Sequence, residues 1–156
     1  MRKVLIAAIS LGLILMLGAA RAQAIEKIKP DPAAVALLNE FLTALSIPDD
    51  EKRLKAVLPL VHKSLIAKNG DLDRNVKDFS YRKACENVRF YQQPASIYEV
   101  HKGNVFTIGF KETAEQGRND KYFINKKAGV AGRPAPLHVF FPSSGGPPKI
   151  TNMGSL

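Results

Sequence analysis

The C-terminal part of the chain, residues 95–156, constrains the fold most, because it consists of short strand-like segments separated by turn residues. Segments rich in glycine, proline and polar residues lie between these strands, so neighbouring strands should pair in an antiparallel sheet. One face of such a sheet is apolar and must be covered by another layer. We therefore expect an α+β fold in which the preceding helices pack on the sheet. The expected strands are 95–101, 105–114, 121–127, 137–141 and 149–156.

Two of these segments carry the clearest patterns. In 105–114 the residues Phe106, Ile108 and Phe110 lie on one face, as in a half-buried strand. Segment 137–141 is apolar on both faces except at His138, which is typical of a central strand. Residues 115–120 are polar and contain a glycine, so we expect a hairpin loop there.

Helical patterns occupy the region before the sheet. A first helix should begin at Asp31-Pro32, with aspartate as the N-cap and proline in the first turn, and should end at Ile47-Pro48. A second helix begins at Asp49 or Asp50, and Pro59 should kink it or divide it in two. A third helix is expected over 79–90. Four of its residues should face inward: Tyr81, Ala84, Cys85 and Val88.

Residues 1–24 have the organisation of a secretory signal peptide. A basic head is followed by the apolar segment 4–17 and by an A-x-A cleavage signal at Ala22–Ala24. We predict cleavage after Ala24, with Ala22 as the second choice. The alternative is an uncleaved anchor, but about 14 apolar residues are fewer than the roughly 20 that span a bilayer. The chain should therefore be periplasmic or secreted, with no stable membrane anchor.

Removing 24 of the 156 residues leaves 132, enough for a leader over 25–32 and a single domain over 33–156. The removed segment has three basic residues and no acid, so the formal net charge falls from +9 to +6. No run of five or six basic residues is present, and we expect no nucleic-acid partner. The dispersed charge is that of an ordinary soluble protein; the alternative is weak attraction to anionic envelope components.

The sequence contains little that indicates catalysis or metal binding. The lone Cys85 cannot form an internal disulfide and is expected to be buried and inert. Segment 71–82 begins like a calcium loop, but Val76 and Arg82 replace the glycine and glutamate of that motif. We expect a polar loop with Asx turns instead. The three histidines, at positions 62, 101 and 138, lack metal-ligand spacing, so no metal or cofactor is predicted.

The C-terminal strands also carry a family resemblance. The apolar strand 137–141 is followed by the glycine turn at 145–146 and by a final strand that contains Lys149-Ile150-Thr151-Asn152. Together with the order of elements over 33–156, this resembles the NTF2-like superfamily. The resemblance implies a cone-shaped α+β fold, with N-terminal helices packed on a curved antiparallel sheet. That superfamily includes ketosteroid isomerases and SnoaL-like enzymes as well as non-catalytic binding domains.

In family enzymes an aspartate or tyrosine inside the cone performs acid–base chemistry. The resemblance makes Tyr81 and Tyr98 candidates by position, and Asp78 a candidate by its proximity to the third helix. The expected cone strands offer no carboxylate, so no catalytic residue is assigned. The leading hypothesis is an exported, non-enzymatic domain that binds a small apolar or amphipathic ligand in the cone, or a protein partner through the sheet. The alternative is a SnoaL-like or ketosteroid-isomerase-like enzyme, and a homodimer through the sheet is a third hypothesis. The predicted ligand-pocket residues are Tyr81, Tyr98, Phe106, Ile108, Phe110 and His138.

Overall fold

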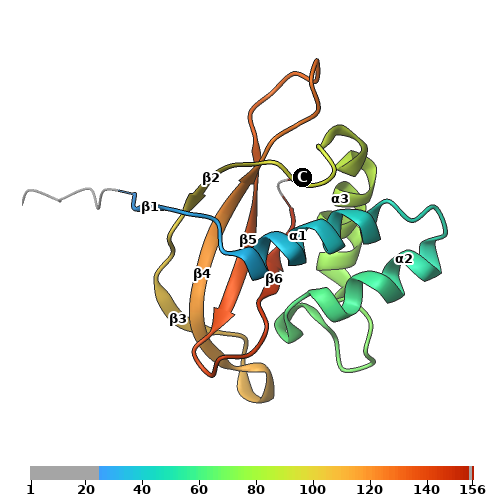
Figure 1. Ribbon diagram of the computed structural model, residues 1–156. Helices are drawn as coiled ribbons and strands as arrows, with labels where there is room; N and C mark the ends of the chain where they lie inside the picture. Colours follow the sequence, from blue (N-terminus) through green and yellow to red (C-terminus); the bar gives the residue numbers. More distant parts are fainter. Residues whose placement is uncertain (1–24, 155) are drawn as a thin grey trace, which may run out of the picture.

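The computed structural model describes residues 25–154 and residue 156, so the predicted signal peptide lies outside the described residues. Within that range the chain has an α+β fold, as predicted, with three α-helices and a curved antiparallel sheet of six strands. Figure 1 shows the helices on one side of the sheet. The helices are α1 (Pro32–Leu45), α2 (Asp50–Val57) and α3 (Arg82–Asn87).

The main path of the sheet has the order β1-β2-β4-β5-β6, and β3 pairs with β4 beside this path. Strand β4 is long enough to pair with β2 along its second half and with β3 along its first half. Strand β5 lies between β4 and β6, which confirms the central position expected for segment 137–141. The strands are β1 (Lys27–Ile28), β2 (Ile97–His101), β3 (Val105–Ile108), β4 (Glu115–Ile124), β5 (Ala135–Pro142) and β6 (Lys149–Asn152).

The first two helices follow their sequence signals. The Asp31 carboxylate accepts hydrogen bonds from the backbone N–H groups of Ala33 and Ala34, and a proline occupies the first turn of α1. Helix α2 ends at Val57, and the short 3₁₀ turn η1 (Leu58–Leu60) contains Pro59. The predicted interruption at Pro59 is therefore confirmed, because proline cannot continue the α-helical hydrogen bonds.

The third helix differs from the prediction. It begins at Val76 rather than at residue 79, as the π-helical segment η3 (Val76–Tyr81), and continues through α3 into the 3₁₀ turn η4 (Val88–Phe90). Side-chain periodicity at the α-helical spacing does not detect a π turn, because the π-helix has a wider repeat. Of the residues expected to face inward, Cys85 is only half-buried.

The sequence prediction was wrong for the region 105–120. Strand β3 ends at Ile108, because Gly109 turns the backbone to a φ of +83° and a 3₁₀ turn, η5 (Lys111–Thr113), follows. The expected polar loop 115–120 is instead the first half of β4. Glycine at position 117 allows this half of β4 to lie beside β5. Any other residue would place its Cβ atom 2.5 Å from the ring of Phe140 on that neighbouring strand.

One polar residue of β4, Asp120, is buried because its carboxylate is hydrogen-bonded. Asp120 is fully buried, and its Oδ1 accepts hydrogen bonds from the Gly103 N–H group and from Arg118 Nε, both at 2.9 Å. Gly103 itself lies against the backbone of Asn119. This contact fixes the turn between β2 and β3, so both strands can pair with the same edge of β4.

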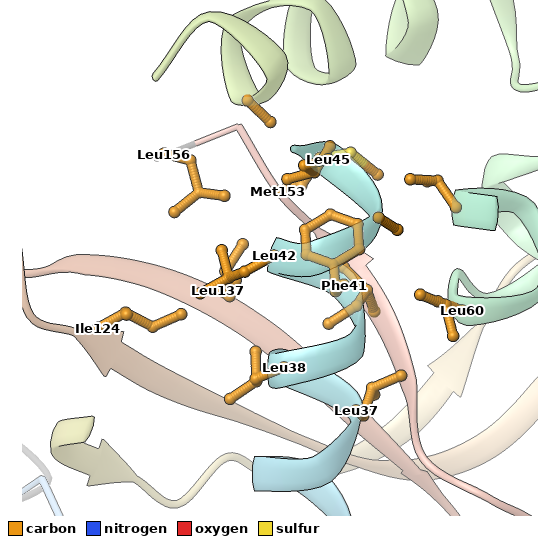
Figure 2. Packing of buried hydrophobic residues seen from close by; sticks show 14 of the residues in the cluster. Leu37, Leu38, Phe41, Leu42, Leu45, Leu60, Ile124, Leu137, Met153 and Leu156 are labelled. Carbon is orange, nitrogen blue, oxygen red and sulfur yellow. The ribbon is translucent and has the colours of Figure 1, made fainter. Parts of the chain in front are cut away.

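The main hydrophobic core fills the space between the helices and the sheet. Figure 2 shows Leu38, Phe41 and Leu42 of α1 beside Leu137 of β5 and Ile124 of β4. All five are at most 2% exposed, as expected for a close-packed interior. On the opposite face of the sheet, His138 lies between Lys121 and Asn152 of the neighbouring strands.

Candidate functional site

The structure does not bring the six predicted pocket residues together. Tyr98, Phe106 and Phe110 are exposed. Ile108 is half-buried at the end of β3. His138 is half-buried between Leu137 and Val139, which are fully buried, so its side chain lies on the opposite face of the sheet from theirs. Only Tyr81 is buried on the helical side. The predicted pocket assumed that 105–114 is a single strand inside the cone, whereas β3 is short and lies beside the main path of the sheet.

The residues that line a depression around Tyr81 come from α2, η3 and α3. This groove has a volume of about 880 Å³. Tyr81 lies at its floor, 8% exposed, whereas Phe79 stands at its rim, 65% exposed. Leu54 of α2 and Cys85 of α3 complete the apolar part of the lining. The π-helical segment places both aromatic rings at the groove, and π turns occur frequently at functional sites.

The Tyr81 hydroxyl is the most informative atom of the groove. It is buried and has no hydrogen-bond partner within the described part of the chain. Burial raises the pKa of this hydroxyl, and the nearby Cys85 thiol raises it further without meeting the geometry of a hydrogen bond. Leaving a buried hydroxyl unpaired costs about 1–3 kcal/mol. A polar atom in this state, at the floor of a groove, is available to a ligand.

Arg53 forms the side of the groove nearest to the loop between α1 and α2. Its guanidinium donates to the carbonyl groups of Ile47 and Pro48, at 2.6 and 2.8 Å, and contacts the Asp50 carboxylate at 2.8 Å. These bonds fix the loop and leave two of the five N–H donors of Arg53 uncommitted to them. Arg53 therefore holds its side of the groove in place.

The charges around the groove nearly cancel. Four acidic and three basic side chains line it, and several are already engaged. Asp50 contacts Arg53, Asp78 contacts Arg74 at 3.5 Å, and Lys77 contacts Asp71 at 2.6 Å. The lining therefore has no strong preference for a large positive or negative net charge on its occupant.

A second buried polar cluster is centred on His62. Its Nδ1 accepts a hydrogen bond from the Ser64 backbone N–H, and the Ser64 hydroxyl lies 2.8 Å from the same nitrogen. The other ring nitrogen, Nε2, lies 3.1 Å from the Glu115 carboxylate, and the ring packs edge-on against Phe140. Burial lowers the pKa of His62 despite the opposing effect of Glu115, so the imidazole is neutral at pH 7.

A hydroxyl, an imidazole and a carboxylate in this order resemble the array of serine hydrolases. Here the arrangement is structural. Nδ1 already caps the 3₁₀ turn η2 (Lys63–Leu65) through the Ser64 backbone, and the His62 ring is only 1% exposed. A general base must reach a reacting group, and this ring is covered. The cluster instead joins the segment at Val61, which bridges to β6, to the start of β4.

The loop 69–75 forms the Asx turns that were predicted for it. Asn69 accepts from the Asp71 N–H group, and Asp73 accepts from the Asn75 N–H group. A hydrogen bond from Lys77 lowers the pKa of Asp71. Among residues 25–154 and 156, no group of three or more histidine, cysteine, aspartate or glutamate side chains is placed to hold a metal ion. None of the helices in this range is long and apolar enough to cross a bilayer.

Comparison with known proteins gives no relative: no protein-family model, no curated protein and no solved structure matches the chain. The site must therefore be interpreted from its own geometry. Sequence analysis identified Tyr81 but missed Phe79, Arg53 and Leu54. For Phe79, the sequence showed only that an aromatic residue begins the predicted helix, two positions before Tyr81. Nothing in the sequence indicated that Arg53 contacts the loop between α1 and α2.

Proposed function

We propose that this protein is an exported, non-enzymatic binding domain that holds a small amphipathic molecule in the groove between α2 and the η3–α3 segment. The observation that carries this proposal is the buried Tyr81 hydroxyl, which has no hydrogen-bond partner among residues 25–154 and 156. The interior between α1 and the sheet is filled by core side chains, so the helical groove is better suited to a ligand than the cone interior expected from the family resemblance.

The lining defines the chemistry of the occupant. The raised pKa keeps the Tyr81 hydroxyl protonated at neutral pH, so it can donate a hydrogen bond to a ligand oxygen. Phe79 and Leu54 offer apolar contact, and the balanced charges favour a neutral or zwitterionic molecule. We infer a small molecule with an apolar body and one oxygen acceptor.

The alternative proposal is a SnoaL-like or ketosteroid-isomerase-like enzyme acting at this groove. Such chemistry needs a group that accepts a proton near neutral pH. The raised pKa of Tyr81 keeps its hydroxyl protonated, so it acts as a hydrogen-bond donor. Of the carboxylates that line the groove, Asp50 and Asp78 already contact Arg53 and Arg74. The balance of these properties favours binding over catalysis.

Export and family membership are parts of the same proposal. The n-region, h-region and A-x-A pattern of residues 1–24 support a cleaved signal peptide and a periplasmic or secreted location. Helices on one side of a curved antiparallel sheet, with the C-terminal strand adjacent to the long apolar strand, support an NTF2-like architecture. A protein partner on the open sheet face is the second candidate for what the domain binds.

Native mass spectrometry of protein purified from the cell envelope tests the groove. We expect a small-molecule adduct on the wild type and its loss in Tyr81→Phe, which removes only the hydroxyl. Tyr98→Phe is the matched control, because Tyr98 is an exposed tyrosine outside the groove, and it should keep the adduct. A bare wild-type mass, or an adduct equally retained in both variants, would contradict the proposed ligand site.

A further inference from the structure

A different surface, which shares no lining residue with the groove, surrounds Phe110. This residue is 74% exposed at the corner between β3 and η5. It lines a depression of about 560 Å³ together with Ile66 and three lysines, Lys63, Lys68 and Lys111. We call these five residues, with Phe110 at the centre, the apex. A contiguous apolar patch with a polar rim marks an interaction site, and here Phe110 and Ile66 form the apolar part within a rim of lysines.

The apex is held in one conformation. Gly109 has a φ of +83°, and Lys111, which is not a glycine, has a φ of +50°. The Phe110 N–H group donates to the Thr113 hydroxyl at 2.9 Å, and that hydroxyl lies 2.9 Å from the Phe110 carbonyl oxygen. A left-handed backbone at a lysine is strained and persists only where the surroundings impose it. Phe110 is thus presented outward by a rigid turn, and little ordering is required on binding.

We propose that the apex is a reversible docking site for an anionic lipid bilayer, with Phe110 entering the headgroup region and the lysines contacting the anionic headgroups. Charge complementarity favours this occupant. Three lysines and a single acid, Glu112, line the depression, although Lys63 also contacts Glu115 at 3.7 Å. Without residues 1–24 the chain carries a formal net charge of +6. Lysines close to a negatively charged bilayer each strengthen association, while the apolar ring adds the hydrophobic contribution.

Two other occupants fit the apex less well. An extended peptide would need a long free strand edge, but β3 has only four residues and ends at the turn of Gly109. A second copy of the chain would bring the lysine rims of two apices together, and like charges would repel. An anionic bilayer is therefore the occupant that fits the apex best. The contact would be peripheral, which agrees with the prediction of no stable membrane anchor.

Vesicle co-sedimentation tests the proposal. Mature protein, without residues 1–24, is mixed with vesicles of phosphatidylcholine alone or of phosphatidylcholine mixed with phosphatidylglycerol. We expect binding only to the anionic vesicles, weakened by added salt. Phe110→Ser should weaken it about tenfold because it removes the apolar contact. Lys68→Glu should also weaken it about tenfold, because a lysine is lost and a repelled charge is gained.

The control is Tyr98→Ser, which removes an aromatic ring of similar exposure (62%) from β2 and should leave binding unchanged. Because Phe110, Lys68 and Tyr98 are all exposed, circular dichroism should show that each variant folds. Equal binding to both vesicle types, or undiminished binding of Phe110→Ser, would overturn the proposal. A dimer that forms without vesicles and disappears in Phe110→Ser would also overturn it, because the occupant would then be a second copy.

Discussion

At the scale of single residues, the buried Tyr81 hydroxyl should destabilise the ligand-free protein. Because the hydroxyl has no partner among the described residues, Tyr81→Phe removes an unpaired polar atom and leaves the ring packing unchanged. We expect the free energy of unfolding of the ligand-free protein to rise by about 1 kcal/mol. Urea denaturation measures this change. A loss of stability of similar size would mean that the hydroxyl makes a stabilising hydrogen bond.

The same substitution removes the donor that we assign to the ligand. Tyr81→Phe should therefore increase stability and abolish the small-molecule adduct together. A residue kept only for packing would show the gain in stability without the loss of an adduct, since tyrosine and phenylalanine rings fill nearly the same volume. The combination of the two measurements separates a binding role from a structural one.

Gly103 is the residue on which the arrangement of β2 and β3 depends. A Cβ atom there would lie 1.8 Å from the carbonyl oxygen of Asn119, and that backbone cannot move without breaking the pairing of β4. We predict that Gly103→Ala lowers the free energy of unfolding by about 3 kcal/mol. Gly146→Ala is the control, because its nearest contact is the Pro142 side chain at 3.7 Å. Equal stability of the two variants in thermal unfolding would show that the turn at Gly103 tolerates a side chain.

At the scale of elements, α1 supplies the largest apolar contribution to the core. Leu38 is fully buried against the sheet, whereas Thr43 is exposed on the same helix. Leu38→Ala should lower the free energy of unfolding by about 3 kcal/mol, because it removes apolar contacts and leaves a cavity. Thr43→Ala should change it by less than about 0.5 kcal/mol. Chemical denaturation of both variants provides the comparison, and a small effect at Leu38 would contradict the assigned core.

Helix α1 could be predicted from sequence because its signals are local. The Asp31 cap, the proline in the first turn and the i, i+4, i+7 spacing all concern neighbouring residues. The division of the second helix at Pro59 is equally local. The first half of β4 could not be predicted, because its polar residues suit a strand only after distant groups are in place. The buried Asp120 carboxylate needs a hydrogen bond from the Gly103 N–H group, and the Phe140 ring leaves no room for a side chain at position 117.

The candidate groove was hidden from sequence for the same reason. Phe79 and Tyr81 are two residues apart, a spacing that places them on different sides of a helix, yet both line the same depression. The predicted pocket in the sheet failed to assemble because β3 leaves the main path after β2. A hydrophobic alternation such as that of 105–110 indicates a strand but does not determine which layer, if any, will cover it.

At the scale of the whole molecule, two histidines, the buried His62 and the half-buried His138, link folding to pH. Burial lowers the pKa of His62, which faces Glu115, Lys63 and Lys149. Burial and the adjacent Lys121 lower the pKa of His138. Both side chains bind a proton more readily in the unfolded chain than in the folded protein. The free energy of unfolding should therefore fall as the pH decreases below about 6.5, the ordinary pKa of histidine.

The expected slope is at most about 1.4 kcal/mol per pH unit for each histidine. Urea denaturation between pH 7.5 and pH 5 measures it, since carboxylates such as Asp71, whose pKa is lowered, titrate below this window. His138→Gln should reduce the slope, and adding His62→Gln should nearly abolish it. The Lys27 contact also lowers the pKa of Glu99, so a second loss of stability should follow at still lower pH. A flat profile from pH 7.5 to pH 5 in the wild type would contradict the burial of neutral histidines, and with it the role of His62 in joining β4 to β6 through the segment at Val61.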